Sequence, residues 1–281
     1  MKIVFRADAS LQIGTGHLIR CLALADAMRE EGADVHFVFR TQPRFKDEIV
    51  TNSGHYLHFL STPESSHGAS GLANADDCPI HAEWLGVRWE QDAEECAAVL
   101  KSIGRPDWLV VDHYALDARW EESLCGSVGR IMVIDDLADR KHDCDVLLDQ
   151  TLAANEVNYR TLVPRACRLL LGPEYALLRP QFAACRVEAE ARRKKNQEIR
   201  RILVAMGGLD CINSTSTVLR GLALLQSHDL EVTVILGSLA PHVDKVMRLA
   251  EKTPFSAHVL TDVRNMAVLM VEHDVCVGSA G

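Results

Sequence analysis

A histidine stands where a glycine-rich turn runs into a helical pattern. The segment KIVFRAD (2–8) has the apolar run of a buried strand, the loop ASLQIGTG (9–16) contains Gly14 and Gly16, and His17 opens the helical pattern. Glycines allow a tight turn and a close approach of the backbone to a ligand. The first N–H groups of a helix attract an anion or a developing negative charge. An imidazole beside them is suited to proton transfer.

This pattern has a plainer alternative. A bare strand-to-helix turn contains the same residue types, and G-T-G is not the complete G-x-G-x-x-G dinucleotide fingerprint. A lone histidine is also usually structural. The position of His17 favours a catalytic role, because open α/β sheets bind their ligands at the carboxyl ends of the strands.

Two more glycine turns follow strand patterns later in the chain. VAMGGLD (204–210) lies between a strand and a helix and offers backbone N–H groups to a phosphate, although such turns are more often structural. VGSAG (277–281) also ends a strand. Glycine turns in both halves of the chain favour a phosphorylated ligand in a cleft between two lobes.

Other polar residues are weaker candidates. Asp135 and Asp136 follow a strand and suit a cation or a water, but a solvated or helix-capping pair is the stronger interpretation. The Ser-, Gly- and Ala-rich stretch 61–87 is long for a loop, which favours a substrate-side flap with Trp84 and Trp89 near its end. The spacing of the potential metal ligands matches no standard zinc pattern; these residues are His55, His58, His67, Cys78 and His81. We therefore expect neither a metal nor a cofactor.

The elements that must position these residues alternate between apolar strands and helices almost throughout. This alternation predicts an α/β protein with mainly parallel sheets covered by helices. The rhythm breaks between 172 and 200, in a segment of helical composition that ends in a charge run. We therefore expect an N-terminal lobe over 1–178 and a C-terminal lobe over 179–281.

Composition excludes several classes of protein. The chain is 48% hydrophobic and carries a net charge of −9, which argues against a nucleic-acid binder. We find neither a signal segment nor an apolar stretch of membrane-spanning length, and therefore expect a cytoplasmic protein without a membrane partner. The nine cysteines never form C-x-x-C, so we expect reduced thiols. Nothing in the sequence indicates the oligomeric state.

Longer segments resemble a known family. FRADASLQIGTGHLIRCLALADAM, VVDHY (110–114), IDDLADRKHDCDVLLDQ (134–150), LGPEYALLRPQF (171–182) and VAMGGLD are similar, in order, to landmarks of the pseudaminic-acid pathway hydrolases. These enzymes remove UDP from a 2,4-diacetamido-2,4,6-trideoxy-L-altrose. They resemble in fold the glycosyltransferase that adds N-acetylglucosamine to lipid I. The resemblance implies a GT-B arrangement of two Rossmann-like lobes, with the nucleotide held mainly by the C-terminal lobe.

The resemblance also implies roles for single residues. His17 corresponds to the general base, and the sugar side would include Asp8, Gly14, Gly16 and the tyrosine of D-H-Y, Tyr114. The UDP side would include Gly207, Gly208, Asp210 and Ser279. In the family a serine–glutamate stretch that binds the uridine follows VGSAG, and this sequence ends at Gly281, so we expect an incomplete UDP site.

The expected function is hydrolysis of a UDP-activated diacetamido sugar in pseudaminic acid biosynthesis. A water activated by His17 would attack C1 with inversion, and UDP, a good leaving group, would need no second carboxylic acid. Helix N-terminal amides would stabilise the departing diphosphate without a metal. Two alternatives stay open: a GT-B glycosyltransferase that uses a UDP-sugar donor, and a non-catalytic nucleotide-sugar-binding protein.

Overall fold

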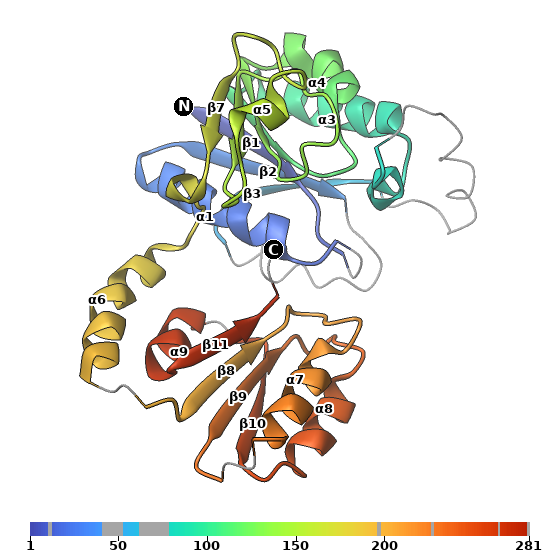
Figure 1. Ribbon diagram of the computed structural model, residues 1–281. Helices are drawn as coiled ribbons and strands as arrows, with labels where there is room; N and C mark the ends of the chain where they lie inside the picture. The colour runs from blue at the N-terminus through green and yellow to red at the C-terminus, as the bar shows by residue number, and fades with distance from the viewer. Residues whose placement is uncertain are drawn as a thin grey trace. The chain divides into compact units, whose positions relative to one another are not determined.

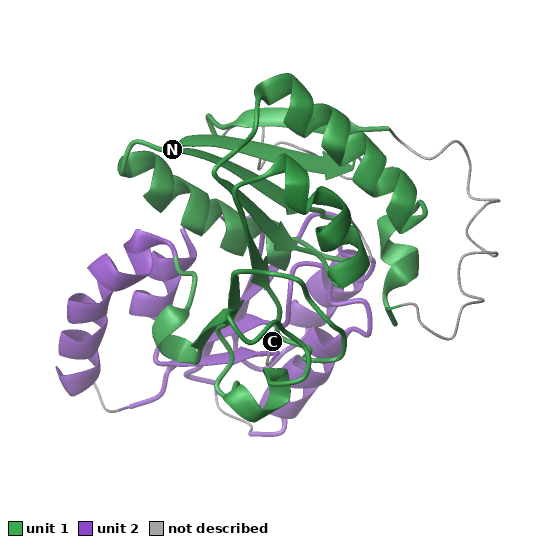
Figure 2. Ribbon diagram, turned by 90° about the horizontal axis from the view of Figure 1, so that it is seen from above, with its two compact units in different colours: residues 1–178 green, residues 179–281 purple. Residues whose placement is uncertain are grey.

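The chain forms two compact units, Met1–Leu178 and Arg179–Gly281 (Figure 2). The computed structural model describes residues 1–10, 13–40, 53–61, 79–195, 198–225, 228–263 and 265–279. Each unit contains a parallel β-sheet with helices on it, so the expected α/β class is confirmed. His67, Cys78 and most of the stretch 61–87 lie outside the described residues.

Unit 1 is built on a seven-stranded parallel sheet in the order β3-β2-β1-β4-β5-β6-β7 (Figure 1). The strands are β1 (Lys2–Ala7), β2 (Asp34–Arg40), β3 (Tyr56–Leu60), β4 (Trp108–Asp112), β5 (Arg130–Ile134), β6 (Val146–Asp149) and β7 (Arg168–Leu171). The helices are α1 (Gly16–Glu30), α3 (Trp89–Ile103), α4 (Ala118–Leu124) and α5 (Glu156–Tyr159), with short 3-10 turns η2 (Ala82–Leu85), η3 (Cys125–Ser127) and η4 (Pro173–Tyr175).

Alternation along β1 sends its side chains to two different helical layers. Ile3, Phe5 and Ala7 pack in one cluster with Leu18, Cys21 and Ala25 of α1. Val4 packs on the opposite face, with residues of α3 and α4. Successive side chains of a strand point to opposite faces of the sheet. The odd or even position of a residue at a strand end therefore determines which helical layer it faces.

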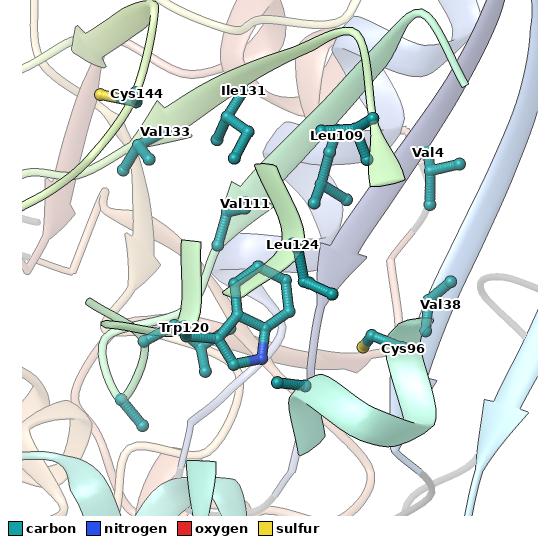
Figure 3. Close-up of a cluster of buried hydrophobic side chains, with 14 of the residues drawn as sticks. Val4, Val38, Cys96, Leu109, Val111, Trp120, Leu124, Ile131, Val133 and Cys144 are labelled. Atoms are coloured by element: carbon teal, nitrogen blue, oxygen red, sulfur yellow. The ribbon is translucent and has the colours of Figure 1, made fainter. Parts of the chain in front are cut away.

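The α3–α4 face is filled around one large side chain. Trp120 of α4 is fully buried and lies among Val111, Leu124 and Cys96 (Figure 3). A buried Trp needs a partner for its N–H, and Nε1 of Trp120 donates to Asp92 Oδ1 at 3.1 Å. The core of this face is therefore tied to a buried carboxylate.

That carboxylate holds two buried arginines. Arg6 of β1 donates to Asp92 through Nε (3.1 Å) and Nη2 (2.7 Å), and Arg40 of β2 donates through Nη2 at 2.8 Å. Arg6 also forks onto Asp8. Burial alone would raise the pKa of Asp92, but the charge and hydrogen bonds of Arg6 and Arg40 outweigh it and lower the pKa. Buried charges of this kind are stable only when they are paired.

Unit 2 is built on a four-stranded parallel sheet in the order β10-β9-β8-β11. Its elements are α6 (Pro180–Lys195), β8 (Arg201–Ala205), α7 (Ser214–Ala223), β9 (Glu231–Leu236), α8 (Val243–Ala250), β10 (Ser256–Thr261), α9 (Met266–Glu272) and β11 (Val275–Gly278). Val204, Val232 and Val234 pack with Leu219 of α7 and Val246 of α8. Helices α6 and α9 lie together on the other face (Figure 1).

We expect the substitution Asp92→Asn to destabilise unit 1 by about 3 kcal/mol, because it removes the charge shared by two buried arginines. Urea unfolding followed by tryptophan fluorescence measures this, since all four tryptophans lie in unit 1. Glu90→Gln, two residues earlier on α3, is the matched control. Its ion pair with Arg88 is exposed, and we expect its loss to cost less than about 1 kcal/mol. Equal effects of the two substitutions would contradict the assignment.

Candidate functional site

His17 is bonded to a buried carboxylate at the end of β4. Its Nδ1 lies 2.5 Å from Oδ1 of Asp112, and both residues are buried. The pairing follows from strand parity: Asp112 lies opposite Ala7 in the register of β4 on β1. Ala7 faces α1, and His17 is in the first turn of α1. The sheet therefore presents Asp112 to the histidine.

Arg20, one turn after His17 on α1, clamps the same carboxylate. Its Nε donates to Asp112 Oδ2 and its Nη2 to Oδ1, both at 2.7 Å. Its third nitrogen, Nη1, donates to Asp136 Oδ2 at 2.6 Å. Asp136 in turn accepts the hydroxyl of Tyr114 at 2.5 Å. One arginine thus joins the end of β4 and the loop after β5 to the first turn of α1.

The charge on Asp112 determines which ring nitrogen of neutral His17 carries the hydrogen. Burial alone would raise the pKa of Asp112, but His17 and Arg20 outweigh it and hold the pKa well below its usual range. Asp112 is therefore ionised at neutral pH and can only accept a hydrogen bond. Nδ1 of His17 must then carry the hydrogen, which leaves the lone pair of neutral His17 on Nε2.

Tyr114 packs against the histidine rather than bonding to it. The two rings meet edge to face, with centroids 4.4 Å apart. Burial, together with the hydrogen bond to Asp136, raises the pKa of Tyr114. The phenol is therefore neutral and its proton is held by Asp136. In the described contacts the ring of Tyr114 forms an aromatic wall beside His17, and the hydrogen bond to Asp136 fixes the orientation of this ring.

Two further aromatic residues extend this wall. Trp84 and His81 lie in and beside η2, with ring centroids 4.2 Å apart. Their centroids lie 5.9 Å and 5.6 Å from that of Tyr114. Trp84 thus lies beside Tyr114, whose ring contacts His17; the expected flap itself stays a prediction. Trp89 instead begins α3, where it packs against the core and meets Arg119.

The glycine turn before α1 is open. Gly14 has a φ of +79°, which favours glycine, and its N–H donates to Ser10 O at 2.8 Å. A Cβ built on Gly14 or Gly16 meets no described atom within 4 Å. In the described part of the chain no side chain caps the first turn of α1. Among the described residues, the first amides of α1 thus have no side-chain acceptor, an arrangement that suits a negatively charged group.

Asp8 lies on the other face of the sheet from His17. Its carboxylate accepts Arg6 Nη2 at 2.9 Å and the backbone N–H of Arg40 at 2.8 Å, and it lies 3.2 Å from His113 Nε2. Burial would raise the pKa of Asp8, but Arg6 and His113 lower it. Asp8 is 1% exposed. A direct contact between Asp8 and a substrate stays a prediction.

In unit 2 the second glycine turn is arranged differently. Asp210 accepts the backbone N–H groups of Ser214 and Thr215 at 2.8 Å each, which are the first two residues of α7. Asp210 therefore caps this helix. Gly207 and Gly208 are open, since a Cβ on either meets no described atom within 4 Å. Ser279 lies directly after β11 and is exposed. The substrate-binding roles of these four residues stay predictions.

Asp135 and Asp136 do not form a solvated or helix-capping pair, so that interpretation was wrong. Asp136 belongs to the His17 group, as described above. Asp135 is buried; it accepts Arg140 Nη1 at 2.7 Å and the N–H of Ala138 at 3.0 Å. Neither residue joins a cluster of three or more potential metal ligands anywhere among the described residues.

The sequence interpretation missed Arg20, Asp112 and the structural use of Asp136. Two signals point to them. Arg20 is three residues after His17, a spacing that puts both on one face of a helix. Asp112 is the last residue of an apolar strand. It lies at the carboxyl-terminal edge of the sheet, where the loop after the first strand leads to His17. Combining strand parity with helix spacing would have found both residues.

No protein-family profile matches the chain. It is 27% identical over 286 residues to the UDP-2,4-diacetamido-2,4,6-trideoxy-beta-L-altropyranose hydrolase of Campylobacter jejuni, covering 100% of this chain and 85% of the relative. It is 24% identical over 285 residues to an uncharacterized protein of Methanocaldococcus jannaschii, of whose length it spans about half (52%).

Solved structures share the fold. MurG of Acinetobacter baumannii matches with a TM-score of 0.58 at 12% identity, over 99% of this chain and 73% of that one. The UDP-GlcNAc 2-epimerase of Neisseria meningitidis matches with a TM-score of 0.54 at 9% identity, over 100% and 78%. Across the described residues, no helix is both long and apolar enough to cross a membrane. The resemblance predicted from the sequence is confirmed: the chain is similar along its whole length to the C. jejuni UDP-sugar hydrolase and has a GT-B-like fold of two Rossmann-like units.

Proposed function

We propose that this protein hydrolyses a UDP-activated sugar, with His17 as the general base. The observation that carries the proposal is the 2.5 Å contact between His17 Nδ1 and Asp112 Oδ1. This contact puts the proton on Nδ1, and no described residue hydrogen-bonds to Nε2. A neutral imidazole with a free, oriented Nε2 is the form that accepts a proton from water.

In the proposed reaction, water attacks C1 of the sugar on the face opposite UDP. The water oxygen forms a bond to C1, the bond between C1 and the UDP oxygen breaks, and His17 Nε2 takes the proton of the water. The products are the free sugar, with inverted configuration at C1, and UDP. Asp112 stabilises the imidazolium that forms, since its ionised carboxylate already faces Nδ1.

The proposal also places the developing negative charge of the leaving group near the glycine turn before α1. The amides at the start of α1 have no side-chain cap among the described residues. Backbone N–H groups in this arrangement stabilise an anionic oxygen without a metal. UDP is a good leaving group, and the reaction therefore needs no second carboxylic acid.

The aromatic wall supports a sugar on the Tyr114 side of His17. Tyr114, Trp84 and His81 lie within 5.9 Å of one another between ring centroids. A deoxy sugar with acetamido groups carries methyl groups and C–H faces, which pack well on aromatic rings. We propose that Gly207, Gly208, Asp210 and Ser279 serve the UDP, with Asp210 acting by fixing the start of α7.

The substrate proposed is UDP-2,4-diacetamido-2,4,6-trideoxy-beta-L-altropyranose, the compound in the name of the C. jejuni relative. Its hydrolysis would be a step of pseudaminic acid biosynthesis in the cytoplasm. The support is the similarity to that relative along the whole of this chain, together with the contacts of His17 with Asp112 and with the ring of Tyr114.

The proposal is tested by incubating the protein with this UDP-sugar in the absence of an acceptor, with EDTA present. Proton NMR of the anomeric signals should show free sugar appearing first as the inverted anomer, with equimolar UDP. His17→Ala should reduce turnover at least 100-fold, because it removes the base, and leave UDP affinity nearly unchanged. His58→Ala, on the partly buried strand β3, is the matched histidine control and should keep full turnover.

Other outcomes would assign a different function. Turnover that appears only when a sugar acceptor is added would make the protein a transferase. Intact substrate that protects the protein against thermal unfolding would make it a binding protein. If His17→Ala retains more than a few per cent of the wild-type rate, the general-base assignment is wrong even though the protein is a hydrolase.

Asp112→Asn tests how the histidine is controlled. The asparagine amide can donate to Nδ1, which would move the imidazole hydrogen to Nε2 and remove the lone pair that the reaction needs. We expect kcat to fall by roughly 10²- to 10⁴-fold with little change in KM. Steady-state kinetics on the same UDP-sugar measures this change.

Two controls separate positioning from a general loss of structure. Asp107→Asn, just before β4 at its opposite end, keeps an acceptor for the N–H of Lys2 and should leave kcat unchanged. In the double variant His17→Ala/Asp112→Asn the second substitution should add almost nothing to the first, because Asp112 acts through His17. Additive losses would show that Asp112 has a separate role.

A further inference from the structure

Two cysteine thiols meet at the amino-terminal end of the unit 1 sheet. Sγ of Cys144 lies 3.6 Å from Sγ of Cys167. Cys144 is two residues before β6 and Cys167 is directly before β7, and these strands are paired neighbours. A disulfide has an S–S distance of about 2.05 Å. The two sulfurs therefore need to approach by roughly 1.5 Å, which is within the range of side-chain rotation.

The pair differs in its access to solvent. Cys144 is 6% exposed and belongs to the core cluster of the α3–α4 face. Cys167 is partly exposed. A cavity of about 270 Å³ lies against both residues and is lined also by Cys125, Pro164 and Ala166. A small molecule can therefore reach the sulfur of Cys167 first, with Cys144 behind it.

The two thiols also differ in acidity. The hydrogen-bonding contact with Cys144 lowers the pKa of the Cys167 thiol. The same contact, together with burial, raises the pKa of Cys144. The thiolate is the form that attacks a disulfide. Cys167 is therefore the attacking member of the pair and Cys144 the second member.

We propose that Cys144 and Cys167 form an oxidisable dithiol that reacts with small organic disulfides. The Cys167 thiolate attacks one sulfur of the small disulfide, whose S–S bond breaks and releases one thiolate. Cys144 then loses its proton, attacks the Cys167 sulfur and expels the second thiolate. The protein pair loses two electrons and two protons, and the small disulfide is reduced to two thiols.

The cross-link would tie an edge strand of the sheet to its neighbour. β7 is the last strand of the order β3-β2-β1-β4-β5-β6-β7. The closed loop contains Tyr159, whose hydroxyl donates to Asp149 Oδ2 at 3.0 Å and to the carbonyl of Asp135 at 3.2 Å. His17 lies at the carboxyl ends of the strands, whereas the thiols precede the strand starts. Oxidation should therefore stabilise the edge of the sheet without altering the His17 group.

The test exposes the reduced, folded protein to oxidised glutathione, then alkylates the free thiols and maps the peptides by mass spectrometry. We expect one intramolecular cross-link, between Cys144 and Cys167, with a loss of two hydrogens that dithiothreitol reverses. The loop holds some twenty residues, and its closure should raise the thermal midpoint of unit 1 by roughly 5 °C in tryptophan fluorescence. A cross-link that lowers the midpoint would overturn the proposed geometry.

Variants assign the two roles. Cys144→Ser should accumulate glutathione on Cys167, and Cys167→Ser should leave Cys144 unmodified. Cys125→Ser, in the lining of the same cavity, is the matched control and should still cross-link. The proposal is overturned if the exposed Cys125 and Cys211 react as fast as Cys167 without any link to Cys144, or if the link joins Cys125 to Cys167. The wild-type peptide map decides this even if a variant fails to fold.

Discussion

The carboxylate of Asp112 is the point on which the candidate site depends. It is fully buried, and three hydrogen bonds from His17 and Arg20 keep it ionised. A buried charge without these partners would be strongly destabilising. The side chains of His17 and Arg20 are in turn oriented by their hydrogen bonds to this carboxylate. The register of β4 against β1 sets this arrangement, since a slip of one residue would turn Asp112 away from α1.

The residue after Asp112 connects the site to the opposite face of the sheet. His113 points toward Asp8, 3.2 Å from its Oδ2, and accepts the N–H of Ala115 on Nδ1 at 3.1 Å. Burial lowers the pKa of His113, so this histidine is neutral at neutral pH. Asp8 continues through Arg6 to Asp92 of α3. Buried ion pairs therefore lie on both faces of the sheet at the carboxyl ends of its strands. Two consecutive residues at the end of β4, Asp112 and His113, each contact one of these groups.

Much of the fold could be predicted from the sequence because its strands are covered on both faces. Such strands read as continuous apolar runs, and runs that alternate with helices indicate a parallel sheet. Helices α4 and α5 were not predicted, since seven and four residues give too few turns for a periodic pattern. Asp117 and Asn155, which cap these two helices, were the available signals.

The site was less predictable because it consists of pairings rather than motifs. His17 and Tyr114 were named separately, and the structure brings their rings into contact. Asp136 was interpreted as a solvated or capping residue, because two adjacent acids after a strand look exposed. Its partners, Arg20 and Tyr114, are 116 and 22 residues away in sequence. Only the three-dimensional register brings such partners together.

The two glycine turns show how one local pattern supports two different chemistries. Both follow a strand and precede a helix, and both leave open space over their glycines. In unit 2, Asp210 occupies the first amides of α7 with its own carboxylate. In unit 1 no described side chain does this for α1, and a histidine stands in the first turn instead. An acid placed before a helix satisfies its amides internally, whereas an imidazole leaves them open to an incoming anion. Among the described residues, one carboxylate therefore makes the difference between helix amides that are satisfied within the protein and helix amides that have no side-chain acceptor.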